Sequence, residues 1–276
     1  MMLEIKDLKV AFQNETGPAT EVVHGISFSL GKGETLGIVG ESGSGKSVLS
    51  LATIGLLPKT AKATGKVLFN DEDILTMSEK SLCKLRGSRI GMIFQEPMTA
   101  LNPAMKVGSQ ITEALRLHSN ISRADANAEA LRLLKMVRIP DAKRKMHSYP
   151  HEMSGGQRQR VGIAIALSLK PDLLIADEPT TALDVTVQAE ILDILDDLVT
   201  GLGIALILIS HDLGVIARIA DRTLVMYHGN EMEQGETERV LRQPSHDYTR
   251  KLLSALPRRA RAGLDVIAPT ALGDSV

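Results

Sequence analysis

Short, continuously apolar runs alternate with segments of helical spacing along most of the chain. The runs that we predict to be strands are 3–12, 22–30, 35–39, 67–69, 90–94, 173–176, 204–209 and 224–227. Helical patterns occupy 46–57 and 187–199. We expect Pro58 and Gly201 to end these two helices. Buried strands that alternate with helices predict an α/β fold with a mainly parallel sheet, covered on both faces.

The pattern changes between about residues 97 and 159, where strand-like runs are missing. Ser122 and Asp125 form an N-cap signature in front of a helical pattern, which Pro140 ends. We therefore expect a helical insert in this part of the chain.

These patterns predict one domain over residues 1–256. Its α/β core is expected at about 1–96 and 160–235, on either side of the insert at about 97–159. Residues 257–276 show no clear period, and we expect them to form a short, loosely ordered tail.

Composition narrows the class of protein. Lysine and arginine number 32 against 33 acidic residues, a formal net charge of −1, so the sequence does not predict nucleic-acid binding. Cys83 is the single cysteine, which excludes an intrachain disulfide and an all-cysteine metal site. The first residues lack a signal-peptide pattern, and the longest apolar runs are too short to span a bilayer. We expect a soluble chain that reaches a membrane only through a partner.

A glycine-rich stretch, GESGSGKS, follows the predicted strand at 35–39 and precedes a predicted helix. Its residues are Gly40, Glu41, Ser42, Gly43, Ser44, Gly45, Lys46 and Ser47, and they match G-x-x-x-x-G-K-[ST] in full. The glycines let backbone amides turn around phosphate oxygens at a helix N-terminus. Lys46 would reach the β- and γ-phosphates, and the Ser47 hydroxyl would bind Mg²⁺. The stretch predicts a nucleoside triphosphate site; the alternative is a glycine-rich turn that binds nothing.

Two carboxylates follow the apolar run at 173–176. Open parallel sheets carry their chemistry at the carboxyl ends of strands, so Asp177 is placed to hold Mg²⁺ through water. Because side chains alternate along a strand, we expect Glu178 on the other face, orienting an attacking water or accepting its proton. Gln95 and His211 also follow predicted strands and could meet the γ-phosphate or the water. The alternatives are an acidic helix cap for the pair and plain surface positions for the other two.

The stretch HEMSGGQRQR at 151–160 precedes another apolar helical pattern. Ser154 and Gln157 fit a capping box, whereas two glycines are poor helix formers. A capped helix start with glycines also exposes backbone amides and the positive end of the helix dipole, which suits an anion. The residues by themselves leave both a plain helix cap and an anion site open.

Taken together, these motifs resemble the ATPase subunit of an ATP-binding cassette (ABC) transporter. The motifs are GESGSGKS at 40–47, Gln95 in IFQEP, MSGGQ at 153–157, LLIADEP at 173–179, TALD at 181–184 and SHD at 210–212. They stand in the order of that family, over about residues 3–256. The resemblance implies a P-loop NTPase (RecA-like) core with an antiparallel β subdomain and an inserted α-helical subdomain. It also implies that two subunits close head to tail over two ATP molecules.

The resemblance implies roles for individual residues. The signature residues that would contact ATP on the partner's phosphate loop are Ser154, Gly155, Gly156 and Gln157. Glu178 is implied as the catalytic base, and His211 as the residue that holds the γ-phosphate and the water. Gln95 would join the Mg²⁺ and water shell and sense the membrane subunit. Asp184 would belong to a loop at the dimer interface, and Phe12 is the candidate for stacking on adenine. The implied metal-binding residues are Ser47, Gln95 and Asp177.

Three longer phrases resemble the ATPases of dipeptide, oligopeptide and nickel importers. They are MIFQEPMTALNP at 92–103, ADEPTTALDVTVQAEIL at 176–192 and HDYTRKLLSALP at 246–257. Many of those proteins carry a cysteine-rich C-terminal extension that holds an iron–sulfur cluster. Cys83 lies far from that region, so we expect no cluster.

The resemblance also implies partners and a location. The partners are a second ABC ATPase, of the same or a related chain, and two membrane-spanning permease subunits. An extracytoplasmic substrate-binding protein would act indirectly. The chain would lie peripherally on the cytoplasmic face of the membrane.

A soluble ABC ATPase of DNA repair or ribosomes is the alternative, but it commonly carries coiled coils, zinc modules or a second cassette. A P-loop kinase or GTPase would leave MSGGQ unexplained.

Overall fold

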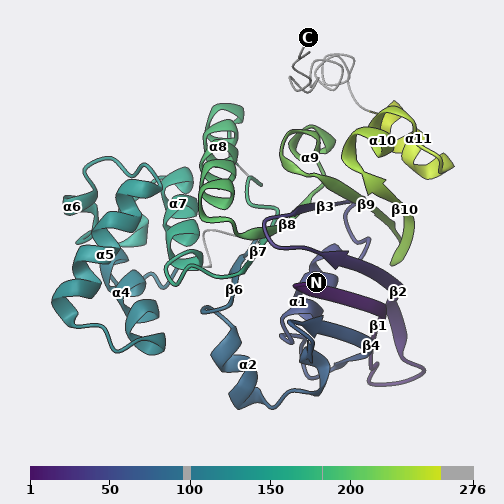
Figure 1. The fold of residues 1–276 in the computed structure, drawn as a ribbon, viewed down its shortest axis with the longest axis horizontal. Coiled ribbons are helices and arrows are strands. Elements are labelled where there is room, and N and C mark those ends of the chain that lie inside the picture. The colour runs from purple at the N-terminus through teal and green to yellow at the C-terminus, as the bar shows by residue number, and fades with distance from the viewer. Residues whose placement is uncertain (96–100, 182, 256–276) are drawn as a thin grey trace, which may run out of the picture.

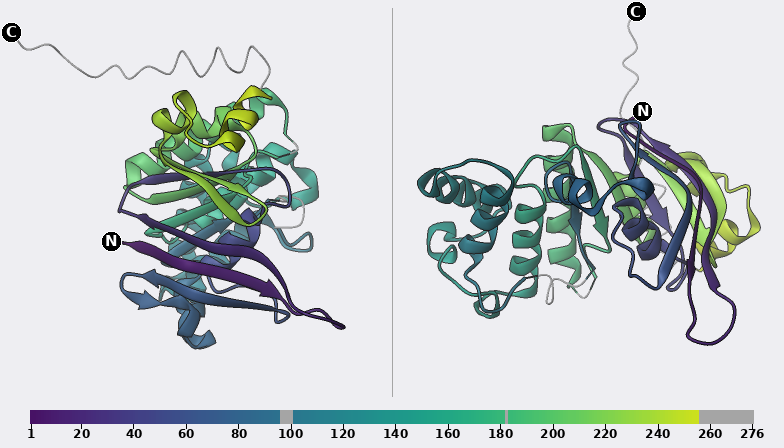
Figure 2. Two further views of the ribbon diagram at one scale, coloured as in Figure 1. Left: turned by 90° about the vertical axis from the view of Figure 1, so that its right-hand side faces the viewer. Right: turned by 90° about the horizontal axis from the view of Figure 1, so that it is seen from below.

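The computed structural model describes residues 1–95, 101–181 and 183–255. This part of the chain forms two β-sheets and a group of helices that gathers at one end of the molecule (Figure 1). The right-hand view of Figure 2 shows the same separation, with the helical end away from the N-terminal strands. The expected tail at 257–276 lies outside the described residues.

The first sheet is antiparallel, with the strand order β2-β1-β4-β5. Its strands are β1 (Leu3–Phe12), β2 (Thr20–Leu30), β4 (Ala61–Phe69) and β5 (Glu72–Asp73). The buried positions of β1 change phase between Ile5 and Leu8, at a break in the pairing with both neighbouring strands. Asp7 has a left-handed φ of 44° at this break, which is typical of a β-bulge.

The second sheet has the strand order β10-β9-β3-β8-β7-β6. Its strands are β3 (Thr35–Val39), β6 (Ile90–Ile93), β7 (Leu173–Asp177), β8 (Ala205–Ser210), β9 (Arg222–Tyr227) and β10 (Asn230–Glu236). The β9–β10 pair is antiparallel and the other pairs are parallel, which confirms the predicted mainly parallel sheet. Every residue of β3, β7 and β8 is buried, as expected for strands covered on both faces.

Helices connect these strands and cover them. The α-helices are α1 (Lys46–Thr53), α2 (Glu79–Leu85), α4 (Val107–His118), α5 (Arg123–Met136), α6 (Ala142–Lys145), α7 (Gly155–Ala166), α8 (Val185–Leu202), α9 (Leu213–Ile219), α10 (Thr237–Arg242) and α11 (Asp247–Ser254). Two short 3₁₀-helices are η1 (Ile74–Thr76) and η2 (Pro150–Glu152). Helices α4 to α7 form the group at the left of Figure 1. The division into core and insert remains a prediction, and the boundary expected near residue 159 falls inside α7.

The parallel sheet separates two hydrophobic clusters. Leu173 and Ile175 of β7 face a cluster shared with the antiparallel sheet and α1. Leu174 and Ala176, on the other face of the same strand, belong to a cluster shared with α4, α5, α7 and α8. This alternation fixes the position of the strand, because a shift of one residue would exchange its two faces.

Several predicted ends differ from the structure. Helix α1 ends at Thr53 rather than at residue 57, and Gly55 follows it with a left-handed φ of 64°. Gly201 does not end α8, which continues to Leu202 and ends at Gly203, with φ 63°. Only a glycine that adopts the left-handed conformation ends a helix in this way, and Gly201 remains helical. Strand β4 begins at Ala61 and not at residue 67.

The segment after β9, for which the sequence predicts no element, contains β10, α10 and α11. These elements are short and mostly polar. The predicted cap at Ser122 is confirmed, because its Oγ accepts a hydrogen bond from the Asp125 N–H at 3.1 Å. Within the described ranges, no helix has the length and apolar character needed to cross a bilayer.

Candidate active site

Four parallel strands end side by side at one edge of the second sheet. The paired residues at their ends are Val39 with Ser210, Ile209 with Asp177, and Ala176 with Ile93. The segments that follow these strands begin with Gly40, His211, Glu178 and Phe94. The register therefore brings the phosphate loop, the acidic pair, Gln95 and His211 to the same edge of the sheet.

The phosphate loop is seated closely against β2 and the end of β9. A Cβ at Gly40 would collide with the carbonyl oxygen of Met226, and a Cβ at Gly45 would lie 2.9 Å from the carbonyl oxygen of Val22. Gly45 also has a left-handed φ of 93°. The Gly229 N–H donates to the Ser44 carbonyl oxygen at 3.1 Å. These contacts explain why glycine is needed at the first and sixth positions of the motif.

Lys46 lies inside the loop, with 4% of its surface exposed. Its Nζ donates to the carbonyl oxygens of Gly40 and Glu41, both at 2.8 Å, and to Ser44 Oγ at 3.3 Å. Burial lowers the pKa of Lys46, and the charges of Glu178 and Asp177 oppose this shift. The ammonium is thus held by atoms that a phosphate oxygen could replace as hydrogen-bond acceptors.

Asp177, the last residue of β7, is 4% exposed and interacts with the Ser47 hydroxyl. Burial raises the pKa of Asp177, the charge of Glu178 adds to the increase, and Ser47 and Lys46 oppose it. Its Oδ1 is buried without a hydrogen-bond partner among the described residues. A bare carboxylate oxygen beside a hydroxyl fits Mg²⁺, which takes oxygen ligands and keeps several waters. The described residues contain no group of three His, Cys, Asp or Glu side chains that could hold a metal ion.

Glu178 is the centre of a hydrogen-bonded cluster. Its Oε2 accepts from Gln95 Nε2 at 3.1 Å and from Thr181 Oγ1 at 2.8 Å, and it lies 3.2 Å from His211 Nδ1. The Glu178 side chain is 13% exposed, whereas His211 is 61% exposed. The cluster joins three residues that the sequence singled out separately. Thr181 joins them as a further residue of the site. Its sequence signals are its place three residues after Glu178, within the same turn, and its position as the first residue of TALD at 181–184.

The backbone at Glu178 is unusual. Its φ is 47°, in the left-handed region that non-glycine residues rarely adopt, at a cost on the order of 1 kcal/mol. The Glu178 N–H donates to the Ile209 carbonyl oxygen at 2.9 Å, which holds the turn in place. Asp177 and Glu178 have different partners, as alternation predicts, but the turn as well as the strand directs Glu178.

The second candidate anion site begins α7. Ser154 is exposed, and its Oγ accepts from the Gln157 N–H at 3.3 Å, as predicted for an N-cap. A Cβ at Gly155 would meet Leu183 at 3.4 Å, and a Cβ at Gly156 would lie 2.5 Å from Val187 Cγ1. This site therefore packs on the start of α8, whereas the phosphate loop packs on β2 and β9.

Asp184 is the N-cap of α8, where its Oδ1 accepts from the Val187 N–H at 3.0 Å. Val185, the next residue, is 81% exposed. The starts of α7 and α8 thus lie together, because Val187 contacts Gly156. Phe12 ends β1, is partly buried, and packs against the cluster that contains α1. Its stacking on adenine remains a prediction.

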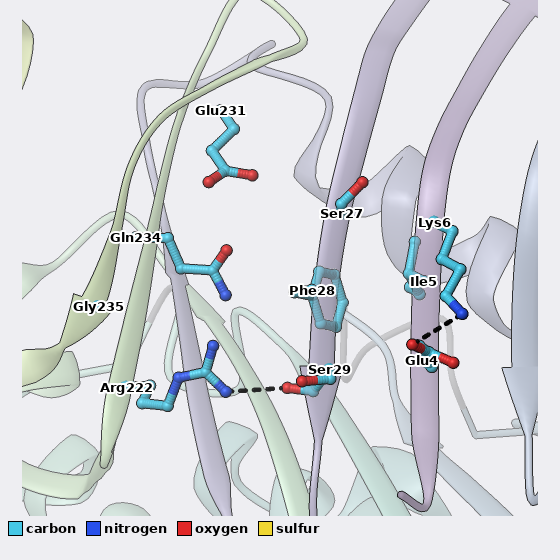
Figure 3. Close-up of a pocket in the computed structure, with 10 residues that line it drawn as sticks. All are labelled: Glu4, Ile5, Lys6, Ser27, Phe28, Ser29, Arg222, Glu231, Gln234 and Gly235. Carbon is cyan, nitrogen blue, oxygen red and sulfur yellow. Dashed lines mark hydrogen bonds and ion pairs between the residues drawn. The ribbon is translucent and has the colours of Figure 1, made fainter.

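A separate groove of about 530 Å³ lies between the two sheets and is lined by residues of β1, β2, β9 and β10 (Figure 3). Arg222 donates to the Ser29 carbonyl oxygen at 3.1 Å and pairs with Glu34 at 3.0 Å. Burial raises the pKa of Glu231, and a hydrogen bond to the Ser27 backbone opposes the shift. Arg222 of β9 and Glu231 of β10 both interact with the backbone of β2. We therefore interpret the groove as the contact line between the two sheets.

Comparison with known proteins gives consistent relatives. The ABC transporter family profile matches residues 23–181. The oligopeptide transport ATP-binding protein OppD of Salmonella typhimurium is 50% identical over 267 residues, covering 97% of this chain and 79% of that protein. The dipeptide transport ATP-binding protein DppD of Bacillus subtilis is 49% identical over 259 residues, covering 93% of this chain and 77% of that protein.

A solved structure is similar as well. It is a dimeric ATP-binding cassette in a post-hydrolysis state with ADP and phosphate, with a TM-score of 0.76 and 26% identity. The match covers 86% of this chain and 99% of that one. The family profile spans more than half of the chain and includes the phosphate loop, the signature and the acidic pair. The chain therefore belongs to the ABC transporter family, as an ATPase that couples ATP hydrolysis to transport.

Proposed function

We propose that this chain binds ATP and Mg²⁺ at residues 40–47 and Asp177, hydrolyses ATP with Glu178 as the base, and powers peptide import as one half of an ATPase pair. The observation that carries the catalytic part is the convergence of Gln95, Thr181 and His211 on Glu178 Oε2. Glu178 comes directly after Asp177, the last residue of β7. The charges of both carboxylates act to raise the pKa of Lys46.

In this proposal a water attacks the γ-phosphorus of ATP while the bond to the β-γ bridging oxygen breaks. Glu178 accepts the proton that the water loses, and ADP leaves with the bridging oxygen. Lys46 would exchange its loop carbonyls for phosphate oxygens and neutralise their charge. His211 and Gln95, which already contact the Glu178 carboxylate, would orient the water and the γ-phosphate. Mg²⁺, held by Ser47 and Asp177 with Gln95 nearby, would supply further charge neutralisation.

The signature would serve a second subunit. The exposed Ser154, the partly exposed Gly155 and the N-terminal amides of α7 support an anion site that is separate from the chain's own phosphate loop. Gly156 and Gln157 complete this site, and Asp184 would lie at the dimer interface beside it. The dimeric form of the similar cassette supports this arrangement.

Peptide is the proposed substrate class, because the similar proteins are named for oligopeptide and dipeptide transport. A related small solute, such as nickel, is the finer alternative within the same subfamily. The proposed partners are a same or related ATPase chain and two permease subunits, with an extracytoplasmic binding protein acting through them. The chain would lie on the cytoplasmic face of the membrane, without a role in nucleic-acid binding.

Two measurements test this function. The purified chain should release phosphate from ATP only with Mg²⁺, and the Lys46→Ala variant should not. In cells that lack the gene, the unaltered chain should restore uptake of a labelled oligopeptide, and Lys46→Ala should fail. Co-purification with ribosomes or DNA instead of membrane proteins, with uptake unaffected by the deletion, would contradict the proposal and favour a soluble ABC ATPase.

A further inference from the structure

The turn between β7 and α8 contacts the carboxylate of Glu178 through one of its own residues. Thr181 lies three residues after Glu178, and its Oγ1 donates to Glu178 Oε2 at 2.8 Å. The Thr181 N–H donates to the Glu178 carbonyl oxygen at 3.2 Å. Thr181 therefore contacts both the backbone and the side chain of Glu178. A β-branched side chain has few allowed χ1 rotamers, and this restriction limits the directions that the hydroxyl can take.

Hydrogen bonds from neighbouring elements hold this turn in place. The Glu178 N–H donates to the Ile209 carbonyl oxygen of β8 at 2.9 Å. Gln188 of α8 donates from Nε2 to the Thr180 carbonyl oxygen at 3.0 Å, and Thr180 is 6% exposed. The turn is thus bonded to the adjacent strand and to the helix that follows, so the Thr181 hydroxyl has a defined position relative to the carboxylate.

Thr181 differs from the other two residues that contact Glu178 Oε2. Gln95 is exposed and the His211 side chain is 61% exposed, whereas Thr181 is half-buried. Gln95 and His211 also have proposed roles toward the water and the γ-phosphate, so a bound nucleotide would compete with Glu178 for them. The Thr181 hydroxyl has no such second role, and its bond to the carboxylate can persist while nucleotide is bound.

The two carboxylate oxygens of Glu178 have different surroundings. Oε2 is contacted by Thr181, Gln95 and His211. Within the described ranges, no hydrogen bond or ion pair reaches the other oxygen, Oε1. Hydrogen bonds to a carboxylate oxygen stabilise its charged form, which makes that oxygen a poorer proton acceptor. Oε1 is therefore the oxygen that is left to accept a proton.

We propose that Thr181 is a positioning residue for ATP hydrolysis, whose hydroxyl holds Glu178 Oε2 and turns Oε1 toward the attacking water. The inference rests on the proposed role of Glu178 as the base. The water gives its proton to Oε1 while its oxygen bonds to the γ-phosphorus and the bond to the bridging oxygen breaks. Thr181 keeps its own proton on Oγ1. A base that is already oriented needs no rearrangement during the reaction, so this contact raises kcat and leaves nucleotide binding unchanged.

The test uses the full chain and measures ATP turnover, ADP affinity by titration calorimetry and thermal unfolding. Thr181→Val keeps the shape of the side chain but removes the hydroxyl. It should lower kcat about 10- to 100-fold, the effect of one hydrogen bond to a charged group, while the KM for ATP and the Kd for ADP change less than about twofold. Thr181→Ser keeps the hydroxyl and should hold kcat within about threefold of the unaltered chain.

Gln188→Leu is the matched control, because it removes a hydrogen bond to the same turn without touching the carboxylate. It should lower the unfolding midpoint and keep kcat within about threefold of the unaltered chain. An equal fall of kcat in Thr181→Val and Gln188→Leu would assign the effect to the turn as a whole and overturn the role of the hydroxyl. A kcat of Thr181→Ser as low as that of Thr181→Val would overturn it as well.

The Glu178→Gln variant separates an effect on the base from an effect on a subunit interface. Thr181→Val added to Glu178→Gln should cause little further loss of turnover, because the hydroxyl acts through the carboxylate. The ATP concentration that drives Glu178→Gln into dimers, followed by light scattering, should stay the same in the double variant. Weaker dimerisation of the double variant would place Thr181 at the contact with the partner and overturn the inference.

The same measurements distinguish failure of this inference from failure of the proposed base. Unaltered turnover in Thr181→Val, beside a disabled Glu178→Gln, would overturn the role of Thr181 alone. Full turnover in Glu178→Gln would overturn the base and this inference with it. A rise of the KM for ATP in Thr181→Val with kcat unchanged would mean that Thr181 serves nucleotide binding, which contradicts a role in positioning the base.

Discussion

Glu178 and His211 meet at one carboxylate oxygen, with His211 Nδ1 3.2 Å from Glu178 Oε2. Their strands, β7 and β8, are neighbours, so the two residues sit at adjacent strand ends. The imidazole is largely exposed and the carboxylate is largely buried. Because His211 is exposed, a water that reaches its ring also comes close to the Glu178 carboxylate.

Replacement of Glu178 tests the base. Glu178→Gln keeps an acceptor for Thr181 and the size of the side chain but cannot accept a proton. We expect ATP turnover to fall about 10²- to 10⁴-fold, with ADP affinity retained, as measured by phosphate release and calorimetry. Saturating ATP should also drive the variant into dimers visible by light scattering. Turnover near that of the unaltered chain would show that another group is the base, and a strictly monomeric species would count against the paired arrangement.

Asp177→Asn separates stability from metal binding. Because burial raises the pKa of Asp177, the folded state disfavours the charged form, and ionised Asp177 costs stability at pH values above that raised pKa. At neutral pH without Mg²⁺, the variant should therefore unfold at the same temperature or higher. In thermal unfolding, added Mg²⁺ and ADP should raise the unfolding midpoint of the unaltered chain more than that of the variant.

Asp172→Asn, at the other end of β7, is the control and should keep the full Mg²⁺ response. An Mg²⁺ response that survives in Asp177→Asn would remove this residue from the metal site.

Gly156 supports folding as well as the proposed signature. Gly156→Ala should lower the free energy of unfolding by about 1–3 kcal/mol, because its Cβ would lie 2.5 Å from Val187 Cγ1. Gly162→Ala lies in the same helix, and no described residue comes within 4 Å of the added Cβ, so this change should raise stability by about 0.5–1 kcal/mol. Denaturant unfolding of both variants checks the contrast. Equal effects of the two changes would mean that the α7–α8 contact carries no such constraint.

Gly155 is consequently the better probe of a site for the partner's ATP. Among the residues that the structure describes, a Cβ there would meet Leu183 alone, at 3.4 Å. Gly155→Val should spare ADP binding to the monomer and abolish most ATP turnover, because the side chain would block the amides of α7. Turnover that persists in a folded Gly155→Val protein would argue against the trans role of this helix start.

Glu233 makes the docking of the C-terminal segment pH-dependent. Burial by itself would raise the pKa of Glu233, but hydrogen bonds from Ser245 and the His246 N–H lower it to about 2. The carboxylate thus stabilises the fold fully above its usual pKa of 4.5, and this stabilisation is lost as the pH falls toward about 2. Its size at neutral pH is on the order of 3 kcal/mol.

Glu233→Gln should therefore lower the unfolding midpoint at pH 7 and flatten its dependence on pH below about 5. Thermal unfolding between pH 7 and 3 measures this. Glu238→Gln removes an exposed carboxylate from the same region and serves as the control, with a small effect at every pH. A Glu233→Gln midpoint that falls with acidity as steeply as that of the unaltered chain would show that other carboxylates dominate.

The sequence by itself determined the local parts of this protein. The phosphate loop needs only a buried strand, a glycine pattern and a helix start, all contiguous in 35–53, and the structure has each of them. The caps at Ser122 and Ser154 likewise depend on side-chain and backbone atoms three residues apart. Burial of β3, β7 and β8 on both faces was readable from their apolar runs.

The tertiary structure decided what happens between these parts. Gln95 and His211 reach one oxygen of Glu178 only because β6, β7 and β8 pair in a particular register, which no single segment specifies. Helix α8 passes Gly201 because its apolar face is held by packing, which outweighs the weak preference of one glycine. Tyr248 meets Tyr227 because Glu233 anchors the short polar segment that leads into α11. Contacts between distant segments depend on the whole packing of the chain, so the pattern of one sequence cannot reveal them.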